Sequence, residues 1–350
     1  MERIIAITLT CEHAGAPLLE LLACRFNYLG REEWRQELAA GRLLVNGSAG
    51  QPHDRLVEGD VLVYRPATLD EPPVDWRYAV VYEDEDLLVV DKPAPLPCHP
   101  GGRYFRHTLW ARLKENRGIE SPAFVNRLDR ETSGLVLVAK NRTSARRCQA
   151  QFAAGEVRKT YLVVVEGAFP RGESRAEGWL APDVASAVRK KLRFLRGGIG
   201  LPGQPIACGT SFRLLGWGNA MSLLAAWPHT GRCHQIRATL CSLGFPVVGD
   251  KLYGVDERFF LRLLDESLTA ADRDRLRIGR QALHAAALRF RHPGSGRMLT
   301  FTAPPPPGLE RLVPGTAAAW SRLQETDHNL SGGVEPGTEP SSGSISHTPP

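Results

Sequence analysis

The sequence predicts an α+β protein made of two domains and a polar tail. Residues 67–76 are rich in proline and acidic residues and lack an apolar period, as linkers do. Residues 77–312 alternate short apolar strands with short helical segments. Residues 325–350 contain almost nothing apolar and cannot bury enough surface to offset their ordering entropy, so we expect a disordered tail. Residues 1–66 are expected to form a small N-terminal domain.

The small domain is predicted to contain two helices followed by short strands. The expected elements are helices at residues 17–26 and 31–40 and strands at residues 43–45 and 61–64. Gly41 closes the second helix as its C-cap. The pairs Asn46-Gly47 and Gly59-Asp60 stand between short apolar runs and are turn signals.

The larger domain is predicted from a series of apolar runs. Its clearest strands are expected at residues 80–82, 87–90, 135–139 and 162–165. Residues 83–86 form a polar turn between the first two strands. Residues 231–240 begin after a glycine-containing turn and continue with helical periodicity. The pattern is mixed throughout, which favours the α+β class.

The composition excludes several classes of protein. A hydrophobic fraction of 43% is typical of a soluble globular protein, and no apolar run is long enough to span a bilayer. The apolar start of the chain is soon interrupted by Glu12 and His13, so we expect no signal peptide and a cytoplasmic location. The seven cysteines contain no Cys-x-x-Cys pair, which argues against a disulfide framework and a structural zinc site.

Positive charge is concentrated in the larger domain. The chain has a net charge of +6, but residues 1–66 hold seven arginines and nine acidic residues, a net charge of −2. Residues 77–312 hold 36 lysines or arginines and 22 acidic residues, a net charge of +14, and most of these cations are arginine. Arginine suits phosphate contacts and stacking on bases, so nucleic acid is the expected partner. On charge alone, the alternative to a nucleic-acid-binding protein is a soluble enzyme that is merely basic.

One carboxylate of the larger domain is flanked by two arginines. In residues 126–134, Asn-Arg-Leu-Asp-Arg-Glu-Thr-Ser-Gly, Asp129 lies between Arg127 and Arg130, just before an apolar strand. Nearby positive charge favours the ionised form, so Asp129 is available as a nucleophile or a base. Taken alone, such a string is more often a solvated surface loop.

Three more segments change that assessment. Residues 83–97 contain a polar turn, an apolar strand and a proline-rich loop; Lys159-Thr160-Tyr161 opens a strand; residues 231–237 are Gly-Arg-Cys-His-Gln-Ile-Arg. Each has a structural explanation by itself. A tyrosine at the head of a strand, for example, is usually a packing residue. In this order, and together with residues 126–134, they closely resemble the motifs of the RluA-type pseudouridine synthases.

The resemblance covers roughly residues 76–304. The family's motif His-Arg-Leu-Asp-x-x-Thr-Ser-Gly is met by residues 126–134, except that Asn126 replaces the histidine, and its Gly-Arg-x-His-Gln-Ile-Arg motif is met by residues 231–237. Further signature segments of the family fit residues 245–254, 281–285 and 290–293. Because the family's essential carboxylate falls on Asp129, we expect that Asn126 modifies the active site without abolishing it. The implied fold has a central mixed, largely antiparallel sheet with flanking helices.

The resemblance also assigns roles. Asp129 would start cleavage of the glycosidic bond, by attack or by deprotonation, and Arg237 would hold it ionised and aimed. Tyr161 would stack on the uracil after it has left its stack, and Arg127 would fill the space that the base leaves. The other substrate-binding residues expected from the motifs are Leu128, Arg232, His234, Gln235 and Ile236, with Leu128 and Ile236 as pocket walls.

The reaction needs no redox change, metal or activated cofactor, so we expect RNA as the partner and neither a cofactor nor a metal site. The sequence has no glycine-rich phosphate loop or dinucleotide motif. A fused deaminase would need Pro-Cys-x-x-Cys, which residues 97–101 do not supply, and a hydrolase would need a Gly-x-Ser-x-Gly elbow. A non-catalytic RNA-binding protein on the same fold is the alternative, and the complete set of Asp129, Tyr161 and Arg237 argues against it.

Residues 1–66 resemble the S4-like RNA-binding domain. Its pattern, in which "hGxVxVNG" precedes "GD", is met by residues 41–47 and 59–60. The expected helix at residues 31–40 carries three glutamates and two arginines, which removes the usual basic face. Since such a domain in this family often accompanies activity on large-subunit ribosomal RNA, we expect that substrate, with transfer RNA second. A monomer is the default expectation.

Overall fold

The computed structural model describes residues 4–26, 29–66, 71–197 and 203–327. The chain divides into two compact units, each described here by itself. One unit takes in the described residues of Met1–Val74 and His99–Asn116, and the other takes in those of Asp75–Cys98 and Arg117–Pro350. The domain boundaries expected at residues 1–66, 67–76 and 77–312 stay a prediction.

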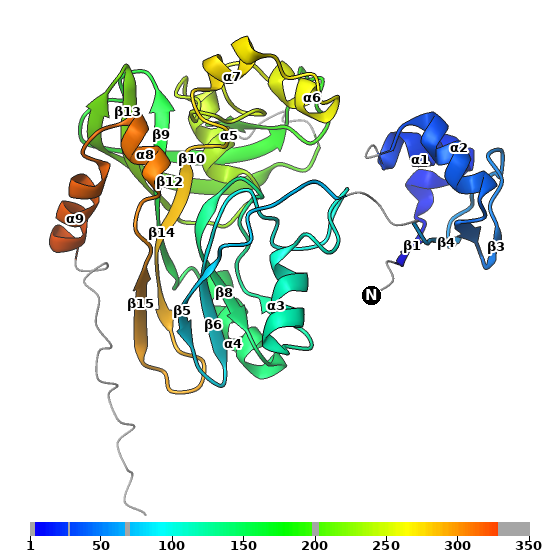
Figure 1. Cartoon of the computed structure of the whole chain (residues 1–350), viewed down its shortest axis with the longest axis horizontal. Helices are drawn as coiled ribbons and strands as arrows, with labels where there is room; N and C mark the ends of the chain where they lie inside the picture. Colours follow the sequence, from blue (N-terminus) through cyan, green and yellow to red (C-terminus); the bar gives the residue numbers. More distant parts are fainter. Residues whose placement is uncertain (1–3, 27–28, 67–70, 198–202, 328–350) are drawn as a thin grey trace, which may run out of the picture. The chain divides into compact units, whose positions relative to one another are not determined.

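The first unit contains a four-stranded antiparallel sheet and two helices that contact each other (Figure 1, blue). Its elements are β1 (Ile5–Thr8), a 3-10 turn (Cys11–His13), α1 (Leu18–Arg25), α2 (Arg31–Ala39), β2 (Leu43–Val45), β3 (Ser48–Ala49) and β4 (Val61–Tyr64). Helix α3 (Leu109–Arg117) also belongs to this unit, apart from its last residue. The strand order is β1-β4-β2-β3. Leucines of both helices pack around Trp34, whose ring meets Tyr64 edge-on at 5.1 Å between centroids.

The two turn signals of this unit bind each other. Asn46 and Gly47 have φ angles of 51° and 85° and form the hairpin turn between β2 and β3. Asn46 Nδ2 donates to Asp60 Oδ1 at 2.8 Å, and Asn46 Oδ1 accepts from the backbone N–H of Val61 at 2.9 Å. The Asn-Gly and Gly-Asp turns are therefore hydrogen-bonded to each other and link the end of β2 to the start of β4.

The second unit is built on an eleven-stranded sheet. Its strands are β5 (Ala79–Glu83), β6 (Leu87–Lys92), β7 (Ala123–Phe124), β8 (Ser133–Ala139), β9 (Arg158–Glu166), β10 (Glu173–Pro182), β11 (Leu192–Leu195), β12 (Ile206–Gly218), β13 (Met221–Pro228), β14 (Leu283–Arg291) and β15 (Met298–Thr302). The main order is β11-β10-β12-β13-β9-β14-β8-β6-β5, with β15 on β14 and β7 on β8. Among the described pairs only β14 and β8 run parallel, which confirms the predicted mixed, largely antiparallel sheet.

Alternation along β9 explains which helices cover which face of the sheet. Val163 and Val165 point into a core shared with α5 (Gln235–Ser242), whereas Leu162 and Val164 point into a core shared with α8 (Pro307–Leu312) and α9 (Thr316–Thr326). The α5 helix and the α8–α9 pair therefore lie on opposite faces, as Figure 1 shows. The remaining helices of this unit are α4 (Arg142–Ala153), α6 (Arg258–Leu264) and α7 (Ala270–Leu276).

The packed part of the chain continues past residue 312. Trp320 and Leu323 of α9 are buried, and this helix includes the first two residues of the segment 325–350 that we expected to be disordered. Residues 328–350 of that segment lie outside the described residues. In the described part of the chain, no helix combines the length and apolarity needed to cross a membrane.

Candidate active site

Asp129 lies in a loop between β7 and β8 that the proline-rich segment holds in place. Cys98 Sγ is 3.4 Å from both the backbone N and the backbone O of Leu128, and the backbone N–H of Leu96 donates to Arg130 O at 2.9 Å. The ammonium of Lys92 is fully buried and donates to Leu96 O at 2.8 Å and to Arg130 O at 3.5 Å. Burial lowers the pKa of Lys92 to about 8. The loop is therefore preorganised from both sides of Asp129.

Gly134 permits the close approach that brings the Asp129 loop to β14. Its φ angle is 110°, and a Cβ atom there would lie 2.3 Å from the backbone oxygen of Ala285, its parallel neighbour on β14. Beside it, Ser133 Oγ contacts His284 Nδ1 at 2.9 Å. Burial lowers the pKa of His284 to about 4, so this histidine is neutral. The Thr-Ser-Gly part of the motif is thus buried and packs against β14.

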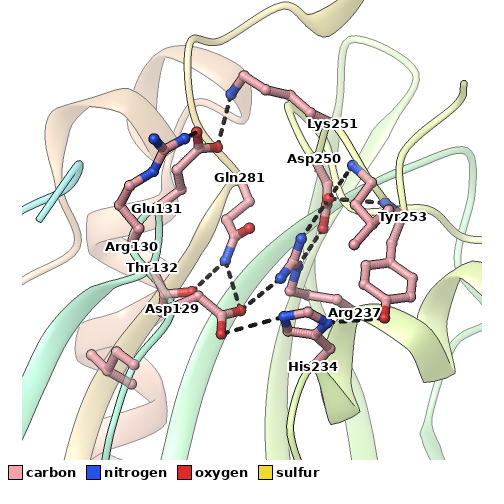
Figure 2. A network of polar contacts seen from close by, with 12 residues as sticks. Asp129, Arg130, Glu131, Thr132, His234, Arg237, Asp250, Lys251, Tyr253 and Gln281 are labelled. Atoms are coloured by element: carbon pink, nitrogen blue, oxygen red, sulfur yellow. Dashed lines mark hydrogen bonds and ion pairs between the residues drawn. The ribbon is translucent and has the colours of Figure 1, made fainter. Parts of the chain in front are cut away.

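Asp129, Arg237 and Asp250 form a row of alternating charges (Figure 2). Arg237 Nη1 donates to Asp129 Oδ2 at 2.8 Å, while its Nε and Nη2 grip Asp250 at 2.6 and 2.9 Å. Asp250 Oδ1 also accepts backbone N–H bonds from Leu252 and Tyr253, both at 2.9 Å. The side chain of Asp250 is 0% exposed and that of Asp129 is 30% exposed. Only Asp129 is open to a substrate.

The surroundings of Asp129 keep it ionised. Burial raises the pKa of this carboxyl, but the charge of Arg237 and the hydrogen bonds from Arg237 and Gln281 outweigh it and hold the pKa below its ordinary value. Gln281 Nε2 lies 3.3 Å from Asp129 Oδ2 and also contacts Thr132 Oγ1. The predicted pairing of Asp129 with Arg237 is present in the structure, while the role of Gln281 was not predicted.

His234 faces Asp129 as a neutral ring. Burial and then the charge of Arg237 lower its pKa. The backbone N–H of Leu192 donates to the Tyr253 hydroxyl oxygen at 3.0 Å, and the same hydroxyl lies 3.0 Å from His234 Nδ1. His234 Nε2 lies 3.9 Å from Asp129 Oδ1. The contact with Tyr253 therefore fixes the edge of the ring that His234 turns toward the carboxylate.

Tyr161 lies on the same sheet face as α5 and packs against the core that contains Ile236. Burial, and then the charge of Asp129, raise the pKa of its hydroxyl, so the phenol stays neutral and cannot serve as a base at neutral pH. No described residue hydrogen-bonds this hydroxyl. The ring of Tyr161 therefore makes its packing contacts, while the hydroxyl makes no hydrogen bond to a described residue.

The other predicted substrate-binding residues fall into two groups. Arg127 and Arg232 are exposed, whereas Leu128 and Ile236 are buried. Gln235 is buried, and its amide is engaged with Thr230, Arg232, Gly209 and Thr210. Any effect of Gln235 on substrate therefore acts through the loop that it holds.

Several site residues received no role from the sequence. Asp250 and Tyr253 lie in the segment 245–254 and Gln281 in the segment 281–285, so their only signal was membership of a family motif. Glu131 pairs with Lys251 at 2.7 Å and with Arg130 at 2.8 Å, which balances the charges beside Asp129. In the described ranges, no three His, Cys, Asp or Glu side chains are grouped so as to hold a metal ion.

Asn126 has a structural explanation. Its Oδ1 accepts from the backbone N–H of Leu137 at 2.7 Å, and its Nδ2 donates to Leu135 O at 3.2 Å. The side chain thus continues the pairing of β7 with β8 for one more step, because the backbone N–H of Val125 already donates to Leu137 O at 2.9 Å. An amide can do this because it carries a donor and an acceptor side by side.

Replacing Asn126 with alanine is expected to lower the free energy of unfolding by about 1–3 kcal/mol, because two backbone groups of β8 lose their partners. Urea unfolding of Asn126→Ala and Asn126→His would measure this loss. The histidine, which offers one donor and one acceptor nitrogen, should lose less. Equal stability of wild type and Asn126→Ala would show that these two bonds contribute nothing.

Comparisons with known proteins show the family of this chain. The family model described as RNA pseudouridylate synthase matches residues 86–242. "Ribosomal large subunit pseudouridine synthase D" of Zymomonas mobilis is 31% identical over 321 residues, covering 87% of this chain and 95% of the relative. "Ribosomal large subunit pseudouridine synthase C" of Escherichia coli is 31% identical over 321 residues, covering 88% and 95%. The solved structure of human RNA pseudouridylate synthase domain containing 1 is similar with a TM-score of 0.54 and 26% identity over 69% of this chain and 90% of that chain.

These relatives match nearly the whole chain rather than one motif. At this identity and coverage, shared family membership follows. The chain belongs to the RNA pseudouridylate synthase family, and it is an isomerase that acts on RNA.

Proposed function

We propose that this enzyme converts uridine to pseudouridine in large-subunit ribosomal RNA, with Asp129 as its catalytic carboxylate. The observation that carries the proposal is the partly exposed, ionised Asp129 held by Arg237, in a loop fixed on both sides. The names of the relatives from Zymomonas mobilis and Escherichia coli support ribosomal RNA of the large subunit as the substrate.

The reaction breaks the bond between uracil N1 and ribose C1′, turns the base and rejoins it through C5. Asp129 would begin it, either by attacking C1′ or by removing a proton from the ribose, and both routes need the ionised form that Arg237 maintains. The uracil would leave its stack to reach this carboxylate, at a cost of a few kcal/mol. Buried Leu128 and Ile236 would close the pocket around the detached base. Arg127, which is exposed beside the loop, would occupy the vacated position in the RNA.

Tyr161→Phe should keep most of the activity, whereas Tyr161→Leu should lower kcat/KM by about 10- to 100-fold. The reason is that stacking on an aromatic ring is worth about 1–3 kcal/mol per base, and the phenylalanine keeps the ring. Steady-state kinetics of both variants would measure this. Equal losses in the two variants would assign the effect to the hydroxyl instead.

The isomerase reaction can be tested directly by tritium release. Forming the new bond at C5 displaces the hydrogen there, so ribosomal RNA transcribed with C5-tritiated uridine should lose tritium when the protein is added. Absence of release from both ribosomal and transfer RNA would favour a non-catalytic RNA-binding protein. Pseudouridine mapping of total RNA from a strain lacking the protein would then decide between ribosomal RNA and transfer RNA as the substrate.

We infer that residues 1–66 form an S4-like RNA-binding module whose helices contribute little positive charge. Its two helices, its Asn-Gly hairpin and its Gly-Asp turn support this assignment. The arginines of α2 and of the turn after it pair with glutamates, in the pairs Arg31–Glu20, Arg35–Glu32 and Arg42–Glu37. Contacts with RNA would therefore come mainly from the second unit, where the net positive charge lies.

A further inference from the structure

The loop between β10 and β11, residues 183–191, is anchored rather than free. Val188 is buried in the core that α5 shares with the sheet. Glu257 accepts hydrogen bonds from Ser186 Oγ at 2.7 Å, from the backbone N–H of Ala187 at 3.2 Å and from Lys191 Nζ at 2.7 Å. The loop therefore holds one conformation, which gives its side chains defined places.

A chain of contacts joins this loop to the proposed catalytic carboxylate. Directly after the loop, the backbone N–H of Leu192 donates to the Tyr253 hydroxyl, which in turn meets His234, and His234 faces Asp129. Three contacts of 3.0, 3.0 and 3.9 Å thus separate residue 192 from Asp129. The end of the β10–β11 loop is part of the rim of the site.

Two adjacent lysines at this rim differ in their partners. Lys191 pairs with Glu257 at 2.7 Å and lies 3.9 Å from Asp183, so its charge is used within the protein. Lys190 is exposed, its Nζ lies 4.2 Å from the centroid of the Phe260 ring, and no described carboxylate pairs with it. The ammonium of Lys190 is thus held over an aromatic face but left without an anion.

The ammonium of Lys190 and the residues around Asp129 are close enough to affect each other electrostatically. The surrounding protein shields Lys190 enough to lower its pKa, and the charges of Arg237 and Arg130 lower it further, while Asp129 raises it. In the other direction, the charge of Lys190 contributes to lowering the pKa of His234. Positive potential is therefore in surplus at this rim, and a bound anion would relieve it.

We propose that Lys190 binds the backbone phosphate of the uridine that enters the active site. This inference rests on the proposed function. A flipped uridine buries its base but leaves its phosphate at the mouth of the pocket, where an exposed cation can reach it. Because the phosphate takes no part in breaking the bond between N1 and C1′, Lys190 is a substrate-positioning residue, and its loss should affect binding more than the chemical step.

The test compares Lys190→Gln with Lys190→Arg and with Arg189→Gln, using tritium release from C5-tritiated ribosomal RNA. Arg189 is the matched control, since it is an exposed cation in the same loop with no described carboxylate partner. Lys190→Gln should raise KM about five- to tenfold and leave kcat within about twofold, because one charge-assisted contact is lost. Lys190→Arg should restore most of the affinity, and Arg189→Gln should resemble wild type. The slope of log KM against log salt concentration should fall by about 0.7 to 1 in Lys190→Gln.

A binding measurement separates this inference from the proposed function. The affinity of Asp129→Asn for a fluorescent RNA stem–loop with uridines in its loop should exceed that of Asp129→Asn/Lys190→Gln about five- to tenfold. Equal losses in Lys190→Gln and Arg189→Gln, or a lower kcat with unchanged KM, would overturn the phosphate contact. If wild type releases no tritium, the proposed function fails, and the two affinities still decide whether Lys190 contacts RNA.

Discussion

Asp129→Asn is expected to abolish isomerisation while leaving RNA affinity within about twofold of wild type. The amide keeps the size of the carboxylate and keeps an oxygen for Arg237, so the row that ends at Asp250 should persist. What it loses is the negative charge that either attacks C1′ or takes a ribose proton, and we expect a fall in turnover of more than about 10³-fold. Tritium release measures turnover, and anisotropy with labelled RNA measures affinity.

Asp250→Asn is the comparison that distinguishes chemistry from support. Both variants remove one negative charge next to Arg237, but the side chain of Asp250 is 0% exposed and accepts four hydrogen bonds, two from the guanidinium and two from the backbone. This variant should therefore lose both stability and turnover. Asp129→Asn gives up only one ion pair, at a partly exposed side chain, so it should lose less stability than Asp250→Asn. Wild-type turnover in Asp129→Asn would remove the assignment of the catalytic carboxylate.

The parts of this fold that were predictable from sequence are those with a local signal. The runs at residues 87–90, 135–139 and 162–165 are continuous apolar stretches, because strands buried on both faces need no polar residues, and all three appear as strands β6, β8 and β9. The Asn-Gly turn was predictable for the same reason, since positive φ angles at two successive residues favour that pair. Family motifs then related Asp129 to Arg237, although 108 positions separate them.

The parts that were not predictable depend on contacts without a local pattern. Gln281 donates a hydrogen bond to Asp129, which is 152 positions away in the sequence, and Asp250 binds Arg237 through side-chain atoms alone. Neither contact leaves a period or a turn signal in the sequence. Strand β1 is four residues long, and among the described strands it pairs only with β4, whose paired residues lie 53 to 59 positions further along the chain. The α9 helix was not predicted, because it lies between Pro314-Gly315 and the polar segment and has few apolar residues, although Trp320 and Leu323 are buried.

Arg237→Met is expected to cost about 3–5 kcal/mol of stability at pH 7 as well as turnover. The side chain of Arg237 is 8% exposed, and without it two carboxylates, those of Asp129 and Asp250, would be left near each other with no cation between them. Arg237→Lys keeps the charge but cannot give Asp250 two hydrogen bonds and Asp129 a third in the same geometry, so an intermediate loss is expected. Urea unfolding measures both.

The pH dependence of that loss identifies its cause. In wild type the pKa values of Asp129 and Asp250 are held below their ordinary values, so their pairing with Arg237 stabilises the fold above the pKa of an unfolded aspartate and ceases to do so only as the pH falls through the lowered folded values. In Arg237→Met both pKa values should rise, because burial and mutual repulsion are no longer opposed. Protonation on going from pH 7 to about pH 4.5 should then relieve the repulsion in the variant while wild type keeps its ion pairs, so the stability difference should shrink. A difference that stays constant over this range would assign the loss to packing around the methionine instead of to the two uncompensated charges.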